Sequence, residues 1–116
     1  MKEVKGFCES LKCVEVLQWY DGPLVETRKD KAGNLYLFWW SNIVKDSTEY
    51  MVVPITKEIL KKLIAQKITC REVLVGNPDG DAYKIYFYKN KIKSFSCKRK
   101  DFSENSLPEK GVYLFP

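Results

Sequence analysis

The stretch LYLFWWSNI at residues 35–43 decides the fold, because it is the strongest strand signal in the chain. Large apolar side chains fill positions 35–40 without interruption, and successive side chains of a strand point to opposite faces of the sheet. Such a strand is central in its sheet and covered on both sides, or one of its faces is a binding surface. The adjacent Trp39 and Trp40 therefore face opposite ways, and we expect one of them in the core.

Shorter strand patterns flank this central strand. Three further strands are predicted, at residues 13–20, 24–29 and 48–53. Residues 21–23, Asp-Gly-Pro, have turn chemistry, because Gly accepts a positive φ and Pro fixes its own φ. Residues 30–34 form a hairpin loop with Gly33 in the left-handed region. Pro54 ends the fourth strand because it has no N–H to donate to a central ladder.

The apolar period changes from two to about 3.6 after residue 55. Apolar residues at helical spacing predict an amphipathic helix over about 56–66, with Thr56 as its N-cap. Residues 69–72, Thr-Cys-Arg-Glu, have the capping-box form and predict a short second helix over about 70–75, ended by Gly76. One amphipathic helix covers only one face of a sheet. We therefore expect the opposite, aromatic-rich face to remain open.

Residues 83–88 and 92–98 predict a C-terminal hairpin. A two-residue turn at Asn90-Lys91 would place Tyr86 beside Phe95 as a cross-strand pair. The order of strands, helices and hairpin predicts an α+β fold with an antiparallel β-sheet meander. A last short strand is expected at 112–115. The 116 residues fit a single α+β domain, residues 1–116.

The hairpin at 83–100 is the most basic part of the chain. Seven cations and no acid lie between Lys84 and Lys100, and aromatic residues alternate with them. The period of two puts Tyr86, Tyr88 and Phe95 on one face. A positive sheet surface with aromatic rings can hold single-stranded nucleic acid. Alternatively, the lysines keep an exposed edge from aggregating while the rings fill the core.

Most enzyme classes lack their usual residues in this sequence. There is no histidine, and the four cysteines include no C-x2-C pair, so neither a zinc ligand set nor an activated nucleophile is visible. Asp79 and Asp81 flank Gly80 without the later acidic ligand of a calcium loop, so they indicate a plain turn. We expect a non-enzymatic protein with no cofactor and no metal site.

Charge and cysteine usage indicate where the protein works. Lys and Arg total 20 and Asp and Glu total 15, a net charge of +5, but only three of the cations are Arg. The excess favours solubility and a weak, salt-sensitive attraction to polyanions. No apolar run is long enough to cross a membrane and no secretory signal is visible. We expect a cytoplasmic protein with reduced thiols.

Several motifs together resemble a family of small uncharacterised bacterial proteins. The more specific motifs are Tyr20-Asp21-Gly22-Pro23-Leu24 and the helix entry Val53-Pro54-Ile55. The remaining matches are strand and helix patterns: Gly33-Asn34-Leu35-Tyr36, Trp40, Leu60, Leu63, Ile68, Arg71 and residues 107–114. The family carries no established activity, so the resemblance implies an α+β fold and no catalytic residues.

The favoured function is a protein-binding module, in the role of an inhibitor or immunity-type factor in bacterial or phage conflict. Trp40, Tyr86 and Tyr88 would anchor the partner, because exposed Trp and Tyr are typical interface residues. Lysines would steer the module towards an acidic protein surface; they are Lys84, Lys91 and Lys93. Self-association is a variant of this hypothesis. The alternative is a nucleic-acid-binding protein that uses the basic aromatic hairpin at 83–100, with RNA or DNA as its partner.

Overall fold

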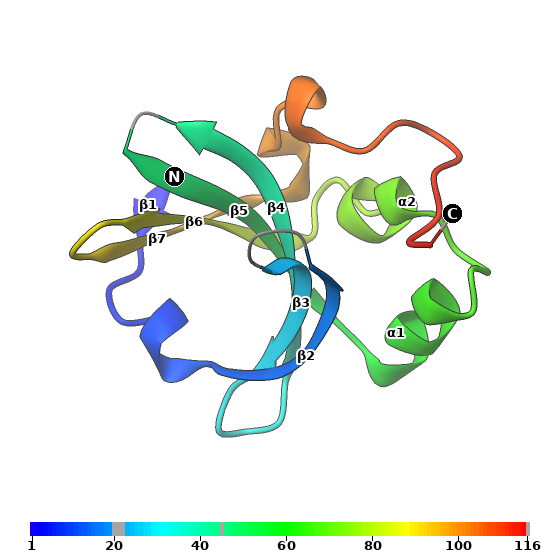
Figure 1. Cartoon of the computed structure of the whole chain (residues 1–116), viewed down its shortest axis with the longest axis horizontal. Helices are drawn as coiled ribbons and strands as arrows, with labels where there is room; N and C mark the ends of the chain where they lie inside the picture. The colour runs from blue at the N-terminus through cyan, green and yellow to red at the C-terminus, as the bar shows by residue number, and fades with distance from the viewer. Residues whose placement is uncertain (20–22, 45, 116) are drawn as a thin grey trace.

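The computed structural model describes residues 1–19, 23–44 and 46–115, so the first two residues of the predicted turn at 21–23 lie outside them. These residues form one antiparallel sheet, two α-helices and three 3₁₀ turns (Figure 1). The strands are β1 (Lys2–Glu3), β2 (Lys12–Trp19), β3 (Pro23–Lys29), β4 (Leu35–Val44), β5 (Ser47–Ile55), β6 (Asp81–Tyr88) and β7 (Ile92–Lys98). The helices are α1 (Lys57–Ile64) and α2 (Cys70–Val75), and the turns are η1 (Cys8–Ser10), η2 (Arg99–Asp101) and η3 (Glu104–Ser106). The predicted α+β class, with one longer and one shorter helix, is confirmed.

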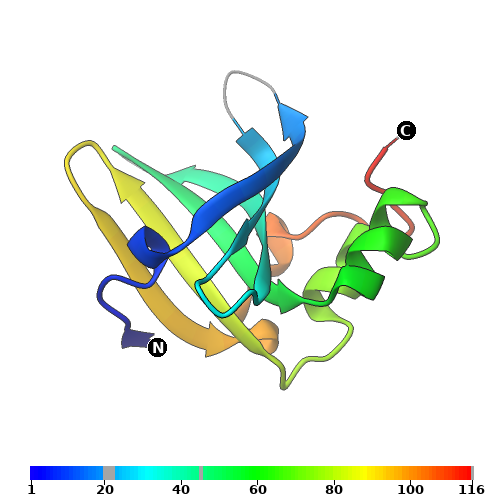
Figure 2. The same cartoon turned by 90° about the horizontal axis from the view of Figure 1, so that it is seen from below.

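The seven strands lie in the order β1-β7-β6-β5-β4-β3-β2. The first two strands of the chain therefore form opposite edges of the sheet, and residues 4–11 connect them. Figure 2 shows the consequence: the sheet is strongly curved, and this N-terminal segment with η1 lies across its concave side. The strand β1, which no sequence pattern predicted, has only two residues and pairs with Ser96 and Phe95 of β7.

The concave face of the sheet is closed by the N-terminal segment, so the expectation of an open face opposite the helix is wrong. Phe38, Val52 and Ile85 are fully buried there, together with Cys8 and Leu11 from the connecting segment. No long apolar pattern before residue 13 predicts that residues 4–11 cover the concave face. Its closing role follows from its tether at both edges of the sheet.

An aromatic cluster fixes the N-terminal segment to the sheet. The ring of Phe7 stacks on Tyr83 with centroids 4.0 Å apart and meets the edge of Tyr36 at 5.3 Å. Such ring pairs stabilise a fold by about 0.5–1.5 kcal/mol beyond the area that they bury. Half-buried tyrosines of the strands are therefore contacts for the chain's own first residues.

The two helices cover one end of the convex face. Leu63 of α1 and Leu74 of α2 pack into a core that includes Leu37 and Val53 of the central strands. Both helices begin as predicted: the Thr56 side chain accepts from the N–H of Ile59, and Thr69 forms a capping box with Glu72. These caps satisfy N–H groups that have no partner inside the helix.

Two strand ends differ from the prediction. The strand β5 continues through Pro54 to Ile55, because it still pairs there with β4. Its pairing with β6 ends at Val52 opposite Tyr83, so the missing N–H of Pro54 lies beyond that ladder. Residues 112–115 form no strand; the carbonyl of Val112 accepts from the N–H of Cys70, and this segment packs beside α2.

The register between β6 and β7 also differs. Tyr86 lies opposite Lys93, and Phe95 lies opposite Lys84, so the expected pair of Tyr86 with Phe95 is wrong by two residues. The N–H of Tyr88 donates to the carbonyl of Lys91, which places the turn one residue earlier than expected. A shift of two residues keeps every side chain on its predicted face, because the side-chain period of a strand is two.

Candidate functional site

The convex face carries a cluster of rings and lysines beyond the end of the helices. Strand register aligns Trp39, Met51, Lys84 and Phe95 in one row across four strands. The next row holds Glu49, Tyr86 and Lys93. We call this cluster the basic aromatic surface; its members are Trp39, Glu49, Lys84, Tyr86, Tyr88, Lys91, Lys93 and Phe95. Figure 1 places the β6–β7 turn at the end of the molecule away from both helices.

The aromatic rings of this surface hold one another in place. Tyr86 and Tyr88 stack with centroids 6.5 Å apart, and Phe95 meets Tyr86 edge-on at 5.8 Å. The ammonium group of Lys91 lies 5.5 Å from the centroid of the Tyr88 ring, within the range of a cation–π contact. Tyr88 is 36% exposed and Tyr86 and Phe95 are half-buried. The rings therefore form a fixed, partly exposed platform.

A single carboxylate lies among the lysines. This carboxylate belongs to Glu49 and accepts a hydrogen bond from the Tyr86 hydroxyl. Burial of Tyr86 and this hydrogen bond raise the pKa of Tyr86 to about 12. The Ser41 hydroxyl lies 3.0 Å from Oε1 of the same carboxylate and 2.9 Å from the carbonyl of Glu49. The carboxylate thus orients the Tyr86 ring and places an acceptor in the middle of the basic aromatic surface.

Five of the six side chains predicted as partner contacts lie on this surface: Lys84, Tyr86, Tyr88, Lys91 and Lys93. The sixth does not, because Trp40 lies opposite Tyr50 and shares the concave face with it. Trp39 takes its place on the convex face, where it also packs against the helix-side core. Sequence alternation shows that the two indoles diverge, but it does not show which of them shares a face with Tyr86, because that depends on the register across three strands.

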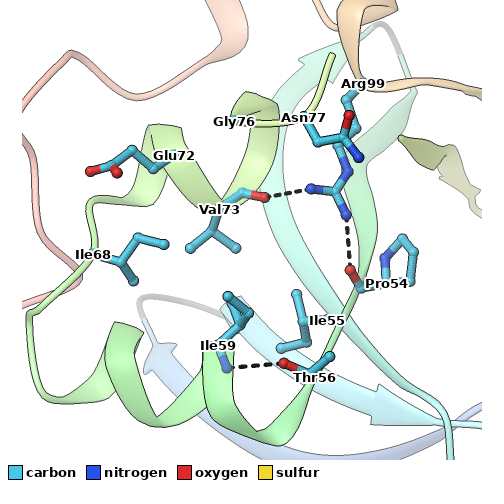
Figure 3. A pocket seen from close by; sticks show the side chains of 10 residues that line it. All are labelled: Pro54, Ile55, Thr56, Ile59, Ile68, Glu72, Val73, Gly76, Asn77 and Arg99. Atoms are coloured by element: carbon cyan, nitrogen blue, oxygen red, sulfur yellow. Dashed lines mark hydrogen bonds between the residues drawn. The ribbon is translucent and has the colours of Figure 1, made fainter. Parts of the chain in front are cut away.

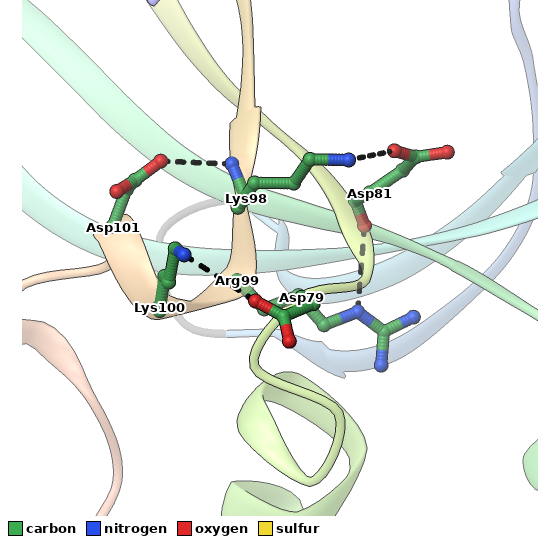
Figure 4. A network of polar contacts seen from close by, with 6 residues as sticks. All are labelled: Asp79, Asp81, Lys98, Arg99, Lys100 and Asp101. Atoms are coloured by element: carbon green, nitrogen blue, oxygen red, sulfur yellow. Dashed lines mark hydrogen bonds and ion pairs between the residues drawn. The ribbon is translucent and has the colours of Figure 1, made fainter.

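Two lysines at the other end of the basic run are paired with acids outside it (Figure 4). Lys98 Nζ lies 2.9 Å from Asp81, and Lys100 Nζ lies 3.3 Å from Asp79. Both aspartates of the 77–81 loop are therefore paired with lysines. Among the described residues, Lys84, Lys91 and Lys93 have no carboxylate within ion-pair distance. Lys84, Lys91 and Lys93 therefore retain their positive charge on the basic aromatic surface.

Two of the cysteines have thiols that are poorly suited to nucleophilic catalysis. The four cysteines are free thiols, and burial raises the pKa of Cys8 and of Cys70 to about 11. A thiol with such a pKa is protonated at neutral pH and is a poor nucleophile. Across residues 1–19, 23–44 and 46–115, no three acidic or thiol side chains are placed to share a metal ion. None of the helices in this part of the chain is long and apolar enough to cross a membrane.

Comparison with known proteins gives one match. The model of a family described as "Family of unknown function (DUF6575)" matches residues 4–116, nearly the whole chain. No curated protein and no solved structure matches. The expectation of a family without an assigned activity is confirmed.

Proposed function

The chain belongs to DUF6575, a family of unknown function, and we propose that it is a non-enzymatic protein-binding module whose basic aromatic surface docks on an acidic protein. The observation that carries this proposal is the platform of Tyr86, Tyr88 and Phe95 with Lys84, Lys91 and Lys93 beside it. Partly exposed tyrosines anchor protein interfaces, and unpaired charges at the rim guide association. The partner supplies carboxylates to the lysines and an apolar contact to the rings.

Nucleic acid is the second candidate, and two features favour a protein instead. The rings pack against one another through their faces and edges, so few free ring faces remain for base stacking. The cations of the surface are lysines, which lack the bidentate geometry that arginine offers to phosphate or guanine.

The narrower form of the proposal is an inhibitor or immunity-type factor that neutralises an acidic protein in bacterial or phage conflict. A fixed platform suits this role, because a partner that binds preformed side chains loses little conformational entropy at the interface. The ring contacts among Tyr86, Tyr88 and Phe95 supply the rigidity.

Affinity capture with matched charge variants tests the proposal. The test variant is Lys91→Glu with Lys93→Glu, and the control is Lys57→Glu with Lys62→Glu on the exposed side of α1. We expect the wild type and the control to retain one stoichiometric protein, and the test variant to bind it at least about tenfold more weakly. Retention of the same protein by both variants contradicts the proposal. A salt-sensitive mobility shift of single-stranded RNA or DNA, lost only in the test variant, supports the alternative instead.

A further inference from the structure

A pocket lies between the two helices and the end of β5, apart from the basic aromatic surface (Figure 3). It is a pocket of about 400 Å³, within the size range of small-molecule sites. Most of its wall is apolar and comes from Pro54, Ile55, Ile59, Ile68 and Val73. One cationic side chain, Arg99, closes one end of this wall.

The guanidinium of Arg99 is anchored by carbonyl groups alone. Nη1 donates to the carbonyl of Val73 at 3.1 Å, Nη2 to that of Pro54 at 3.0 Å, and Nε to that of Asp81 at 3.4 Å. These bonds use three of the five N–H groups of an arginine and leave two. Burial lowers the pKa of Arg99 below its ordinary value, because desolvation disfavours the cation, and the nearby Asp81 charge offsets this effect only in part.

The chain's other two arginines each have a carboxylate partner. Arg28 pairs with Glu26, and Arg71 pairs with Glu104. Within the described part of the chain, Arg99 makes no such pair. A partly buried positive charge at an apolar pocket is thus left for an anion from outside.

The surroundings of Arg99 hold it in position and keep competing acids away. A Cβ on Gly80 would lie 2.9 Å from Nε of Arg99, so glycine is what allows the guanidinium to lie this close to the loop. The Asp81 carboxylate is bound by Lys98. Glu72, at the opposite side of the pocket, bonds to the hydroxyl and N–H of Thr69, and Figure 3 shows its carboxylate pointing away from Arg99.

We propose that this pocket binds a small organic monocarboxylate with an apolar body, whose carboxylate pairs with Arg99 and whose hydrocarbon part lies against Ile55, Ile59 and Ile68. The site combines the two chemistries that such a molecule requires: a charged hydrogen-bond donor at one end and an apolar wall beyond it. An uncharged apolar molecule leaves the two free N–H groups of Arg99 unsatisfied. A strongly polar anion leaves the apolar wall without a partner.

Ligand comparison on the unmodified protein tests the charge requirement without any risk to folding. Octanoate, butanoate and 1-octanol are titrated by NMR chemical-shift mapping and calorimetry. We expect octanoate to saturate with a Kd below about 1 mM, with shifts at residues 54–59, 68–77 and 99. Each added methylene should tighten binding about fourfold, and 1-octanol should bind at least about tenfold more weakly than octanoate. Equal binding of octanol and octanoate, or shifts located elsewhere, overturns the proposal.

Matched variants locate the site. Arg99→Gln should weaken octanoate binding at least about tenfold, whereas Arg71→Gln should leave it unchanged. Ile59→Trp fills the pocket and should abolish binding, whereas Ile64→Trp, on the same helix at a 40% exposed position outside the pocket, should not. Should Arg99→Gln fail to fold, the tryptophan pair decides. Undiminished binding to Ile59→Trp overturns the proposal and leaves the basic aromatic surface untouched.

Discussion

The two faces of the same sheet are covered by different parts of the chain and to different extents. On the concave face, residues 7–11 close the curve of the strands, and even the charges are paired internally: Arg28 lies 2.6 Å from Glu26 and 4.6 Å from the centroid of Phe38. On the convex face, α1 and α2 cover only one end, and lysines and rings at the other end reach solvent. The strands contribute aromatic residues to both faces. What differs is whether the chain returns to cover them.

This contrast shows why aromatic content alone is a weak guide to a binding surface. Tyr36, Tyr83 and Phe87 have the same residue types as the basic aromatic surface, yet they pack around the concave core. A segment anchored at both ends, by β1 on one edge and β2 on the other, loses little entropy when it closes over them. The convex rings have no such tethered segment opposite them in the described structure.

The largest loss of stability is expected from a substitution in the concave core. Phe38→Ala removes a fully buried ring at its centre and should lower the free energy of unfolding by about 3–5 kcal/mol. The matched convex variant Tyr88→Ala, at a 36% exposed position, should cost less than about 1 kcal/mol. Urea denaturation followed by tryptophan fluorescence measures both. Similar losses for the two variants would show that the faces are equally sealed.

A smaller effect comes from the internal charge pair. Arg28→Met leaves Glu26, whose side chain is 4% exposed, without its partner, and should cost about 3 kcal/mol. Adding Glu26→Gln should recover part of this loss, because the uncompensated charge is removed. The control Lys98→Met breaks an exposed ion pair and should leave the denaturation midpoint nearly unchanged. No recovery in the double variant would mean that the guanidinium contributes by packing on Phe38 alone.

The smallest loss of stability is expected from removal of the hydrogen bond between Tyr86 and Glu49 on the convex face. Tyr86→Phe removes the hydroxyl that donates to Glu49 and should cost about 1 kcal/mol at neutral pH. The folded protein keeps this proton until about pH 12, whereas an unfolded tyrosine loses it near pH 10. Stability of the wild type therefore falls between pH 10 and pH 12, and part of that slope disappears in the variant. Denaturation at pH 8 and pH 11 measures the difference, and identical slopes would exclude the hydrogen bond to Glu49.

Elements with a local cause were predictable from the sequence. The caps at Thr56 and Thr69 depend on side chains within three residues, and both helices begin where those residues place them. The hairpin loop at 30–34 carries Gly33 at a φ of +89°, as its position indicated. Five of the candidate contacts also fall on one surface, because four of them occupy alternate positions of two neighbouring strands and the fifth lies in the turn between them.

Elements that depend on distant partners were not predictable. Lys2 and Glu3 form a strand only because the edge of β7 is available to them. Trp40 was grouped with Tyr86 and Tyr88 as a partner contact although it lies on the other face of the sheet, because the register across β4, β5 and β6 is a long-range property. The pairing of Lys98 and Lys100 with loop aspartates joins residues about twenty positions apart.

The sequence by itself determined the α+β class, the helix starts and the alternation of side chains along each strand, because these follow from hydrogen bonds and periodicities within a few residues. The tertiary structure alone decided which face of the sheet the N-terminal segment covers, which tryptophan shares a face with Tyr86, and which arginine has no carboxylate in an ion pair with it. The physical reason is that burial and charge pairing depend on the distances between segments far apart in the chain, which only the packed fold sets.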